Sequence, residues 1–321
     1  MRLVFRVFIV LLLLALLAIG GWMALSVLTS GEPDGPAPAE NREQSPYFTA
    51  EDRLVDAAGM TWRVRESGPA DAPAIILLHG FAHSLEDFEP WADRLERDHR
   101  VIRFDLPGHG LTGPREDGAY SVADTVDQVE ALLEEVAPAD FTIAGNSLGG
   151  LVAWRYAADN PGRVDAVVLL APGGCSINGV TEDPVDPPLP VRLYLQNAPQ
   201  AGVNAATAAL FGDPDQAPEG MTARIGDLMR EPDVGDALVE RIRQFTLPDP
   251  NADLARIEAP VLMIWGAEDP MIPAEHAERF SAALEARHEI VLLDGVGHLP
   301  QLEAPDETVE AVRAFLSGLE R

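Results

Sequence analysis

Lysine is absent from this 321-residue chain, so all 23 of its basic side chains other than histidine are arginines. The absence excludes Schiff-base chemistry, attachment of a pyridoxal cofactor and phosphate binding by a P-loop lysine. Cysteine occurs once, at Cys175, which excludes an internal disulfide bond and a cysteine-based metal cluster. Cysteine usage is therefore compatible with a reducing or an oxidising compartment.

Basic residues are also scarce relative to acidic ones, since 52 aspartates and glutamates give a formal net charge of −29. Such a charge repels nucleic acids and anionic lipid headgroups, so we expect neither to be a main partner. The acidity favours solubility and says little about a substrate. Hydrophobic residues make up 47% of the chain, which supports a sizeable core and argues against global disorder.

An uncharged, apolar run occupies residues 7–28. A helix over its 22 positions, rising about 1.5 Å per residue, would cross a hydrocarbon layer of about 30 Å. Arg2 and Arg6 precede the run and Glu32 follows it, which places the N-terminus in the cytoplasm. We therefore predict that residues 1–30 form a transmembrane anchor and that the rest of the chain lies on the extracytoplasmic side, periplasmic or extracellular.

A cleaved signal peptide is the alternative interpretation of the same run. The apolar region of a signal peptide usually spans about 7–15 residues, which is shorter than this run. Trp22 also lies near the outer end of the run, as an interfacial anchor would. Small residues at Ala24, Ser26 and Ser30 would nevertheless permit cleavage, and the mature protein would then be secreted.

The remaining chain has the pattern of an α/β fold. Residues 31–46, rich in proline, glycine, alanine and acidic residues, predict a flexible linker. Short apolar runs then alternate with helical patterns, which predicts a mostly parallel sheet with helices on both faces. The predicted strands are 61–66, 74–78, 101–104, 141–144, 166–170, 261–265 and 289–292, and the predicted helices are 88–96, 122–136, 148–159, 274–284 and 306–319.

The alternation stops in residues 172–250, where short helical pieces lie among prolines and glycines without a clear strand. We expect this insertion to form a helical cap over the carboxyl edge of the sheet, where ligands of open α/β sheets bind. Residues 47–171 and 251–321 then form the core on either side of the insertion.

A serine lies in a glycine-flanked turn, Gly145-Asn-Ser147-Leu-Gly149, between a predicted strand and a predicted helix. The pattern G-x-S-x-G in this context is typical of a sharp turn that raises a nucleophilic serine above a sheet. Side chains at the two glycines would collide with neighbouring backbone. The following helix points its N-terminus at the serine and favours a developing negative charge there.

An oxyanion hole is predicted from two backbone N–H groups, those of Phe81 and Leu148. Phe81 follows an apolar strand that ends in His-Gly, and Leu148 follows the predicted nucleophile. We interpret His79 as a structural hydrogen-bonding residue rather than a base.

The predicted acid and base follow the last two predicted strands. Asp269 lies in the turn after 261–265, where Glu268 is a rival that we expect to point away. His298 lies in a glycine-flanked loop after 289–292, within the context that a general base needs. Together with Ser147 these residues give the order Ser, Asp, His along the chain.

These residues resemble the α/β-hydrolase superfamily over about residues 46–319. The resemblance is carried by His79-Gly-Phe81, Asp105-Leu-Pro-Gly-His-Gly110, Gly145-Asn-Ser-Leu-Gly149, Trp265-Gly-Ala-Glu-Asp269 and Gly297-His-Leu-Pro-Gln-Leu-Glu303. Small bacterial carboxylesterases and lipases are similar, and so, less closely, are the carbon–carbon bond (meta-cleavage product) hydrolases. The latter usually carry a glycine-rich oxyanion loop and a tryptophan after the catalytic histidine, whereas this chain has Phe81-Ala-His and His298-Leu-Pro.

The resemblance implies a serine esterase or lipase that acts through an acyl-enzyme, without a metal or organic cofactor. Its expected substrate is a small-molecule or lipid-like ester, bound beneath the cap. Candidate substrate contacts are His83, Leu193, Phe211 and Met229. Hydrolysis of vinylogous diketones, acyl transfer and a non-catalytic ligand-binding role on the same fold remain alternatives. The sequence does not indicate chain-length preference or oligomeric state.

Overall fold

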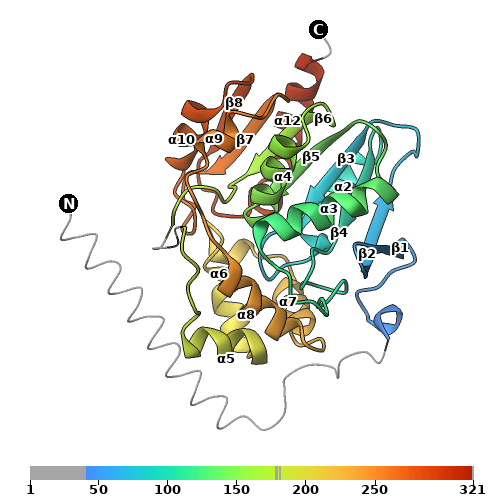
Figure 1. Cartoon of the computed structure of the whole chain (residues 1–321), viewed down its shortest axis with the longest axis vertical. Coiled ribbons are helices and arrows are strands. Elements are labelled where there is room, and N and C mark those ends of the chain that lie inside the picture. Colours follow the sequence, from blue (N-terminus) through green and yellow to red (C-terminus); the bar gives the residue numbers. More distant parts are fainter. Residues whose placement is uncertain (1–40, 178–179, 181, 320–321) are drawn as a thin grey trace, which may run out of the picture.

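The structure, a computed structural model, describes residues 41–177, 180 and 182–319 and contains an eight-stranded sheet with helices on both faces (Figure 1). The strand order is β1-β2-β4-β3-β5-β6-β7-β8. Every neighbouring pair from β4 to β8 is parallel, whereas β2 pairs antiparallel with β1 and β4. The prediction of a mostly parallel sheet is confirmed. The strands are β1 Asp52–Ala57, β2 Met60–Ser67, β3 Ala74–Leu78, β4 Arg100–Phe104, β5 Phe141–Asn146, β6 Val164–Leu170, β7 Val261–Gly266 and β8 His288–Leu293.

The central strands are continuously apolar because both of their faces are covered. In β3, Ile76 and Leu78 join one hydrophobic cluster, whereas Ile75 and Leu77 join another on the opposite face. Side chains of α3, α4 and α10 complete the first cluster, and those of α2 and α12 complete the second. These helices are α2 Glu89–Leu95, α3 Val122–Val136, α4 Leu148–Asp159, α10 His276–Ala283 and α12 Pro305–Leu319.

A group of helices separates β6 from β7 in the chain and lies at one end of the sheet (Figure 1). We call this group the insertion helices. Their apolar side chains form a separate cluster that also includes Leu299, Phe81 and Ala82 from loops of the sheet. The insertion helices therefore pack on the loops at this end of the sheet. They are α5 Leu189–Asn197, α6 Gln200–Ala208, α7 Met221–Met229 and α8 Val234–Gln244.

A buried ionic network joins β2 to the segments that follow β3 and β4. The guanidinium of Arg63, on β2, is fully buried and donates to Asp52, to Asp105 and to Glu86 in the short helix η2 (Leu85–Phe88). Arg65 donates to the same Asp52 carboxylate. Burial alone would lower the pKa of Arg63, but the surrounding carboxylates raise it above its ordinary value. Removing one member of such a network leaves an uncompensated buried charge.

The residues that precede β1 are hydrogen-bonded to this network and to the insertion helices. The carbonyl of Tyr47 accepts a hydrogen bond from Arg63, and its hydroxyl donates to Asp227 of α7 at 2.6 Å. Arg42, in the short helix η1 (Arg42–Gln44), donates to the carbonyl of Thr61. Residues 41–46, which we expected to be the last part of a flexible linker, thus include a segment that packs against β2.

The prediction of an N-terminal transmembrane helix is corrected by the structure. No helix in the part of the chain that the structure describes is long and apolar enough to cross a membrane. The longest described helices, α3 and α12, have 15 residues each and would span about 22 Å, less than a hydrocarbon layer of about 30 Å. The membrane anchor and the extracytoplasmic placement that we drew from it are withdrawn, and residues 1–30, to which the prediction applied, lie outside the described residues.

Replacing Arg63 by methionine is expected to lower the free energy of unfolding by about 3–5 kcal/mol, because the buried Asp105 carboxylate loses its cationic partner and Asp52 keeps Arg65 alone. Urea denaturation measures this loss. The matched control is Arg53→Met, since Arg53 forms a largely exposed ion pair with Glu66 and should change stability by less than about 1 kcal/mol. Equal effects of the two substitutions would contradict the assigned role of the network.

Candidate active site

The turn from β5 to α4 holds Ser147 in strained backbone. Ser147 has φ 53° and ψ −112°, which is unusual for a residue with a side chain. A Cβ added to Gly145 would lie 2.3 Å from the carbonyl oxygen of Gly149, and one added to Gly149 would lie 2.1 Å from that of Leu78. Only glycine allows β5, α4 and the end of β3 to approach this closely, which explains both glycines of the motif.

Asp269 and His298 are joined by a hydrogen bond in the structure. Oδ2 of Asp269 lies 2.8 Å from Nδ1 of His298, and the carboxylate is fully buried. The other oxygen, Oδ1, accepts hydrogen bonds from the backbone N–H groups of Met271 and Ile272. The turn after β7 therefore fixes the carboxylate against the imidazole. Glu268, the rival acid, instead accepts a hydrogen bond from the backbone of Gly295.

Asn146 brings the nucleophile turn and the histidine loop together. Its Nδ2 donates to the carbonyl of Leu170 at 3.1 Å and to that of His298 at 3.0 Å. The residue before Ser147 is therefore hydrogen-bonded to the backbone of His298. Among the described residues, no hydrogen bond joins the Ser147 hydroxyl to the imidazole itself. Such catalytic contacts often tighten only when substrate binds.

The loop after β3 lies against the nucleophile turn. A Cβ added to Gly80 would lie 3.5 Å from Cβ of Ser147, and Ala82 adopts a left-handed conformation with φ 60°. Phe81 lies between these two residues. Leu148 is the first residue of α4, so its N–H has no acceptor within the helix. The two predicted oxyanion donors thus lie on the two segments that meet at Ser147.

His79 and His109 have structural environments. His79 is fully buried, its Nδ1 contacts the carbonyl of Gly80 at 2.7 Å, and its Nε2 accepts a hydrogen bond from the N–H of Leu106. Burial lowers the pKa of His79 and places that of His109 well below its ordinary value. Both rings are therefore neutral near pH 7, and His79 fixes the loop that precedes Phe81.

His83 lies on this same loop and forms a second histidine–carboxylate pair. Its Nδ1 contacts Oδ2 of Asp87, which is fully buried, and Oδ1 of Asp87 lies 3.4 Å from the guanidinium of Arg224 on α7. Burial would raise the pKa of Asp87, but its contacts with His83 and Arg224 lower it below its ordinary value. His83 is therefore held between the loop after β3 and the insertion helices.

The other predicted substrate contacts divide into two groups. Phe211 and Met229 are buried in the cluster of the insertion helices, which also contains Leu299, the residue after His298. Leu193 lies apart from them, since it is 37% exposed and points to solvent from α5. Leu195 of the same helix, in contrast, is buried in the cluster.

Glu303 is a residue near the site whose role the sequence did not reveal. Its Oε2 accepts hydrogen bonds from the backbone N–H groups of Gly212 and Gly297, each at 2.8 Å, and its Oε1 accepts one from that of Leu299 at 3.0 Å. Two of these donors flank His298. The only signal in the sequence was its position in the segment from Gly297 to Glu303.

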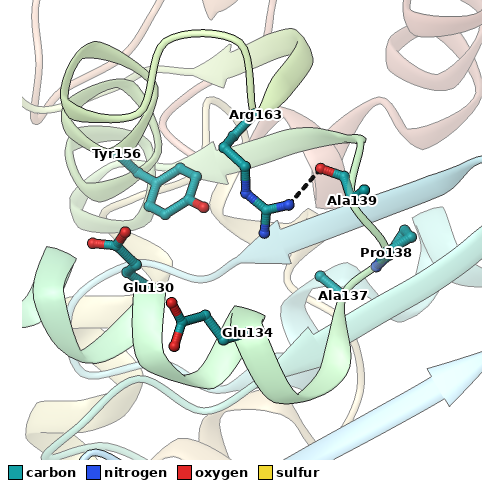
Figure 2. A pocket seen from close by; sticks show the side chains of 7 residues that line it. All are labelled: Glu130, Glu134, Ala137, Pro138, Ala139, Tyr156 and Arg163. Atoms are coloured by element: carbon teal, nitrogen blue, oxygen red, sulfur yellow. Dashed lines mark hydrogen bonds between the residues drawn. The ribbon is translucent and has the colours of Figure 1, made fainter.

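A depression of about 320 Å³ lies between α3 and α4 and is separate from these residues (Figure 2). Figure 2 shows the guanidinium of Arg163 between Tyr156 and the carbonyl of Ala139, to which it donates a hydrogen bond. Glu130 and Glu134 line one side. Arg163 immediately precedes β6, so the depression lies at the amino edge of the parallel strands, opposite the edge that carries Ser147.

The described part of the chain holds no group of three or more histidine, cysteine, aspartate or glutamate side chains suited to a metal ion. The chemistry available at the site is that of a hydroxyl, an imidazole–carboxylate pair and backbone N–H donors.

A sequence profile of the alpha/beta hydrolase family matches residues 75–311, and the chain belongs to this family. It is 29% identical over 271 residues to the dihydrolipoyllysine-residue acetyltransferase component of the acetoin cleaving system of Pseudomonas putida, covering 82% of this chain and 68% of that protein. It is 28% identical over 254 residues to the pimeloyl-[acyl-carrier protein] methyl ester esterase of Nitrosomonas europaea, covering 76% and 96%.

Solved structures agree with this assignment. A lipase candidate from Acinetobacter baumannii superposes with a TM-score of 0.72 at 26% identity, covering 84% of this chain and 91% of that one. A meta-cleavage product hydrolase also shares the fold, at 21% identity and a TM-score of 0.69. The resemblance stated from the sequence is confirmed, and family membership supports hydrolase activity.

Replacing Asn146 by alanine is expected to destabilise the site, because the carbonyl of His298 loses its buried donor, whereas that of Leu170 keeps the backbone N–H of Ser147. The free energy of unfolding should fall by about 1–3 kcal/mol for the carbonyl left unsatisfied. Chemical denaturation measures the change, with Asn204→Ala, at an exposed position of α6, as the control. Unchanged stability of the Asn146 variant would show that these bonds do not hold the two loops together.

Proposed function

We propose that this protein hydrolyses carboxylic esters through a triad of Ser147, His298 and Asp269. The observation that carries the proposal is the 2.8 Å bond between the buried Asp269 carboxylate and His298, on a loop that Asn146 joins to the nucleophile turn. A buried carboxylate on Nδ1 selects the tautomer whose Nε2 can accept a proton, and it stabilises the imidazolium that follows.

The first half of the reaction forms an acyl-enzyme. Nε2 of His298 takes the proton of the Ser147 hydroxyl while the serine oxygen attacks the ester carbonyl carbon. The N–H groups of Phe81 and Leu148 stabilise the resulting oxyanion, and α4 adds the positive end of its dipole. The carbon–oxygen bond to the alcohol then breaks, and His298 returns its proton to the departing alcohol.

Water completes the cycle. His298 removes a proton from a water molecule, whose oxygen attacks the acyl carbon through a second oxyanion held by the same donors. The bond to the Ser147 oxygen breaks, the carboxylic acid leaves, and the proton returns to the serine. Each bond change uses side chains of this chain and one water molecule, so the proposed cycle requires no cofactor.

We further propose that residues 172–250 act as a cap that shapes the substrate site. The support for this is the apolar cluster in which Phe211 and Met229 of the insertion pack with Leu299 and Phe81, the neighbours of the proposed base and oxyanion turn. Apolar side chains at this position are of the kind that line a site for the acyl or alcohol part of a lipid-like ester. His83 would contact the substrate from the loop after β3.

Ser147→Ala is expected to lower kcat for p-nitrophenyl butyrate by about 10⁴-fold or more, because it removes the proposed nucleophile. Asp269→Asn should lower kcat by about 10³–10⁴-fold through the wrong histidine tautomer. Release of p-nitrophenol measures both effects, and Ser317→Ala, at an exposed position of α12, is the control. Turnover retained by the folded Ser147 variant would refute the mechanism.

Two further measurements distinguish ester hydrolysis from the alternative functions. Labelling by a fluorophosphonate at Ser147 is expected, and a protein that only binds ligands would not react. Product analysis should give free acid and alcohol in water. Preferential cleavage of a vinylogous diketone, or transfer of the acyl group to an added alcohol in place of water, would replace ester hydrolysis as the conclusion.

A further inference from the structure

The loop that carries His298 is fastened to the insertion by its backbone. The N–H of His298 donates to the carbonyl of Leu210 at 2.7 Å. A Cβ added to Gly297 would lie 2.4 Å from both that carbonyl oxygen and the N–H nitrogen of Gly212. A Cβ added to Gly212 would lie 2.5 Å from the carbonyl oxygen of Gly295. The two segments are therefore in direct backbone contact, with no room for a side chain between them.

The Glu303 side chain, from the core, binds both segments of this backbone contact. Its carboxylate accepts N–H groups from Gly297 and Leu299, on either side of His298, and from Gly212 in the insertion. A carboxylate can accept all three bonds because neither of its oxygens carries a hydrogen. Hydrogen bonds to an ionised acceptor are also stronger than those between neutral groups. One side chain thus fixes both ends of the base loop to the insertion.

Apolar packing links the same two segments. Phe211 stands between Leu210 and Gly212, and its side chain shares the cluster of the insertion helices with Leu299 and Met229. A change in the position of residues 210–212 would therefore be transmitted to His298 through a backbone hydrogen bond, the Glu303 carboxylate and a shared apolar contact.

We infer that Glu303 is a positioning residue that makes the placement of His298 depend on the insertion. The inference rests on the proposed function, in which His298 is the base. Contact of a bound substrate with the insertion would then order the base loop in addition to retaining the substrate. Interactions of this kind affect kcat more than KM, because they govern the geometry of proton transfer.

The test replaces Glu303 by glutamine, which has nearly the same shape but presents two N–H donors where the carboxylate presents an acceptor. With p-nitrophenyl butyrate we expect kcat to fall roughly 10-fold to 100-fold and KM to change less than about threefold. The matched control is Glu307→Gln, an exposed glutamate of α12 that should leave both constants unchanged. Titration of active sites with a fluorophosphonate corrects kcat for the folded fraction.

The inference is overturned if the corrected kcat of the Glu303→Gln enzyme equals that of the parent, or if only its KM rises. Glu303→Asp is a second variant, since it keeps the charge but is one methylene shorter. It should recover part of the loss in kcat if the carboxylate itself holds the loop. No recovery relative to glutamine would instead assign the effect to packing and overturn the positioning role.

Amide hydrogen exchange on the parent protein gives a measurement that needs no variant to fold. Peptides that cover residues 208–213 and 294–299 are expected to share one level of protection and to gain protection together when a fluorophosphonate with an alkyl chain occupies Ser147. Independent exchange of the two segments would overturn the inference. If Ser147→Ala retained turnover while the two segments still exchanged together, the proposed triad would fail and the coupling of the loops would stand.

Discussion

The close approach of backbone to backbone at the β5–α4 turn is the constraint on which the site depends. Gly145, Gly149 and the carbonyl of Leu78 meet at distances that exclude any side chain. This contact forces Ser147 into strained backbone and aims the first N–H groups of α4 at the same point. The strain is tolerated because the apolar clusters on the two faces of the sheet hold β3, β5 and α4 in place.

Around this turn, each remaining part of the site is held by a polar contact to a different element. Asp269 is fixed by the turn after β7, and His298 is fixed by Asp269, by Asn146 and by the carbonyl of Leu210. The loop after β3 is fixed by His79. The core therefore fixes the orientation of Ser147, whereas the loops fix the positions of His298 and Asp269 relative to it.

Much of the fold could be predicted from the sequence because its signals are local. The continuous apolar strands and the patterns of α3 and α4 gave elements whose limits agree with the structure, since a fully buried strand and an amphipathic helix each leave a distinct periodicity. β1 was not predicted, because it is an edge strand with mostly exposed side chains and pairs only with β2. α7 was also missed, because it follows a proline- and glycine-rich stretch that obscures where the helix begins.

At the candidate site, too, local signals could be predicted from the sequence and contacts between distant segments could not. Glycine spacing and position after a strand indicated Ser147, Asp269 and His298 as residues of one sheet edge, and the structure places the last two in contact. Sequence reasoning could not find the contacts between distant loops. The pairing of Glu303 with Gly212, and of Arg224 with Asp87, depends on how the insertion packs, which no local pattern encodes.

Because its basic members are all arginines, the buried ionic network near β2 loses its contribution to stability at low pH but not at high pH. The guanidinium groups of Arg63 and Arg65 stay protonated throughout the ordinary pH range, so alkaline solution removes no partner. For Asp52 and Glu86, burial would raise the pKa, but the neighbouring arginines lower it below its unfolded value. Their contribution to stability is thus complete above the carboxyl range and disappears as the pH falls through the lowered values, which makes acid, rather than base, the condition that opens this side of the molecule.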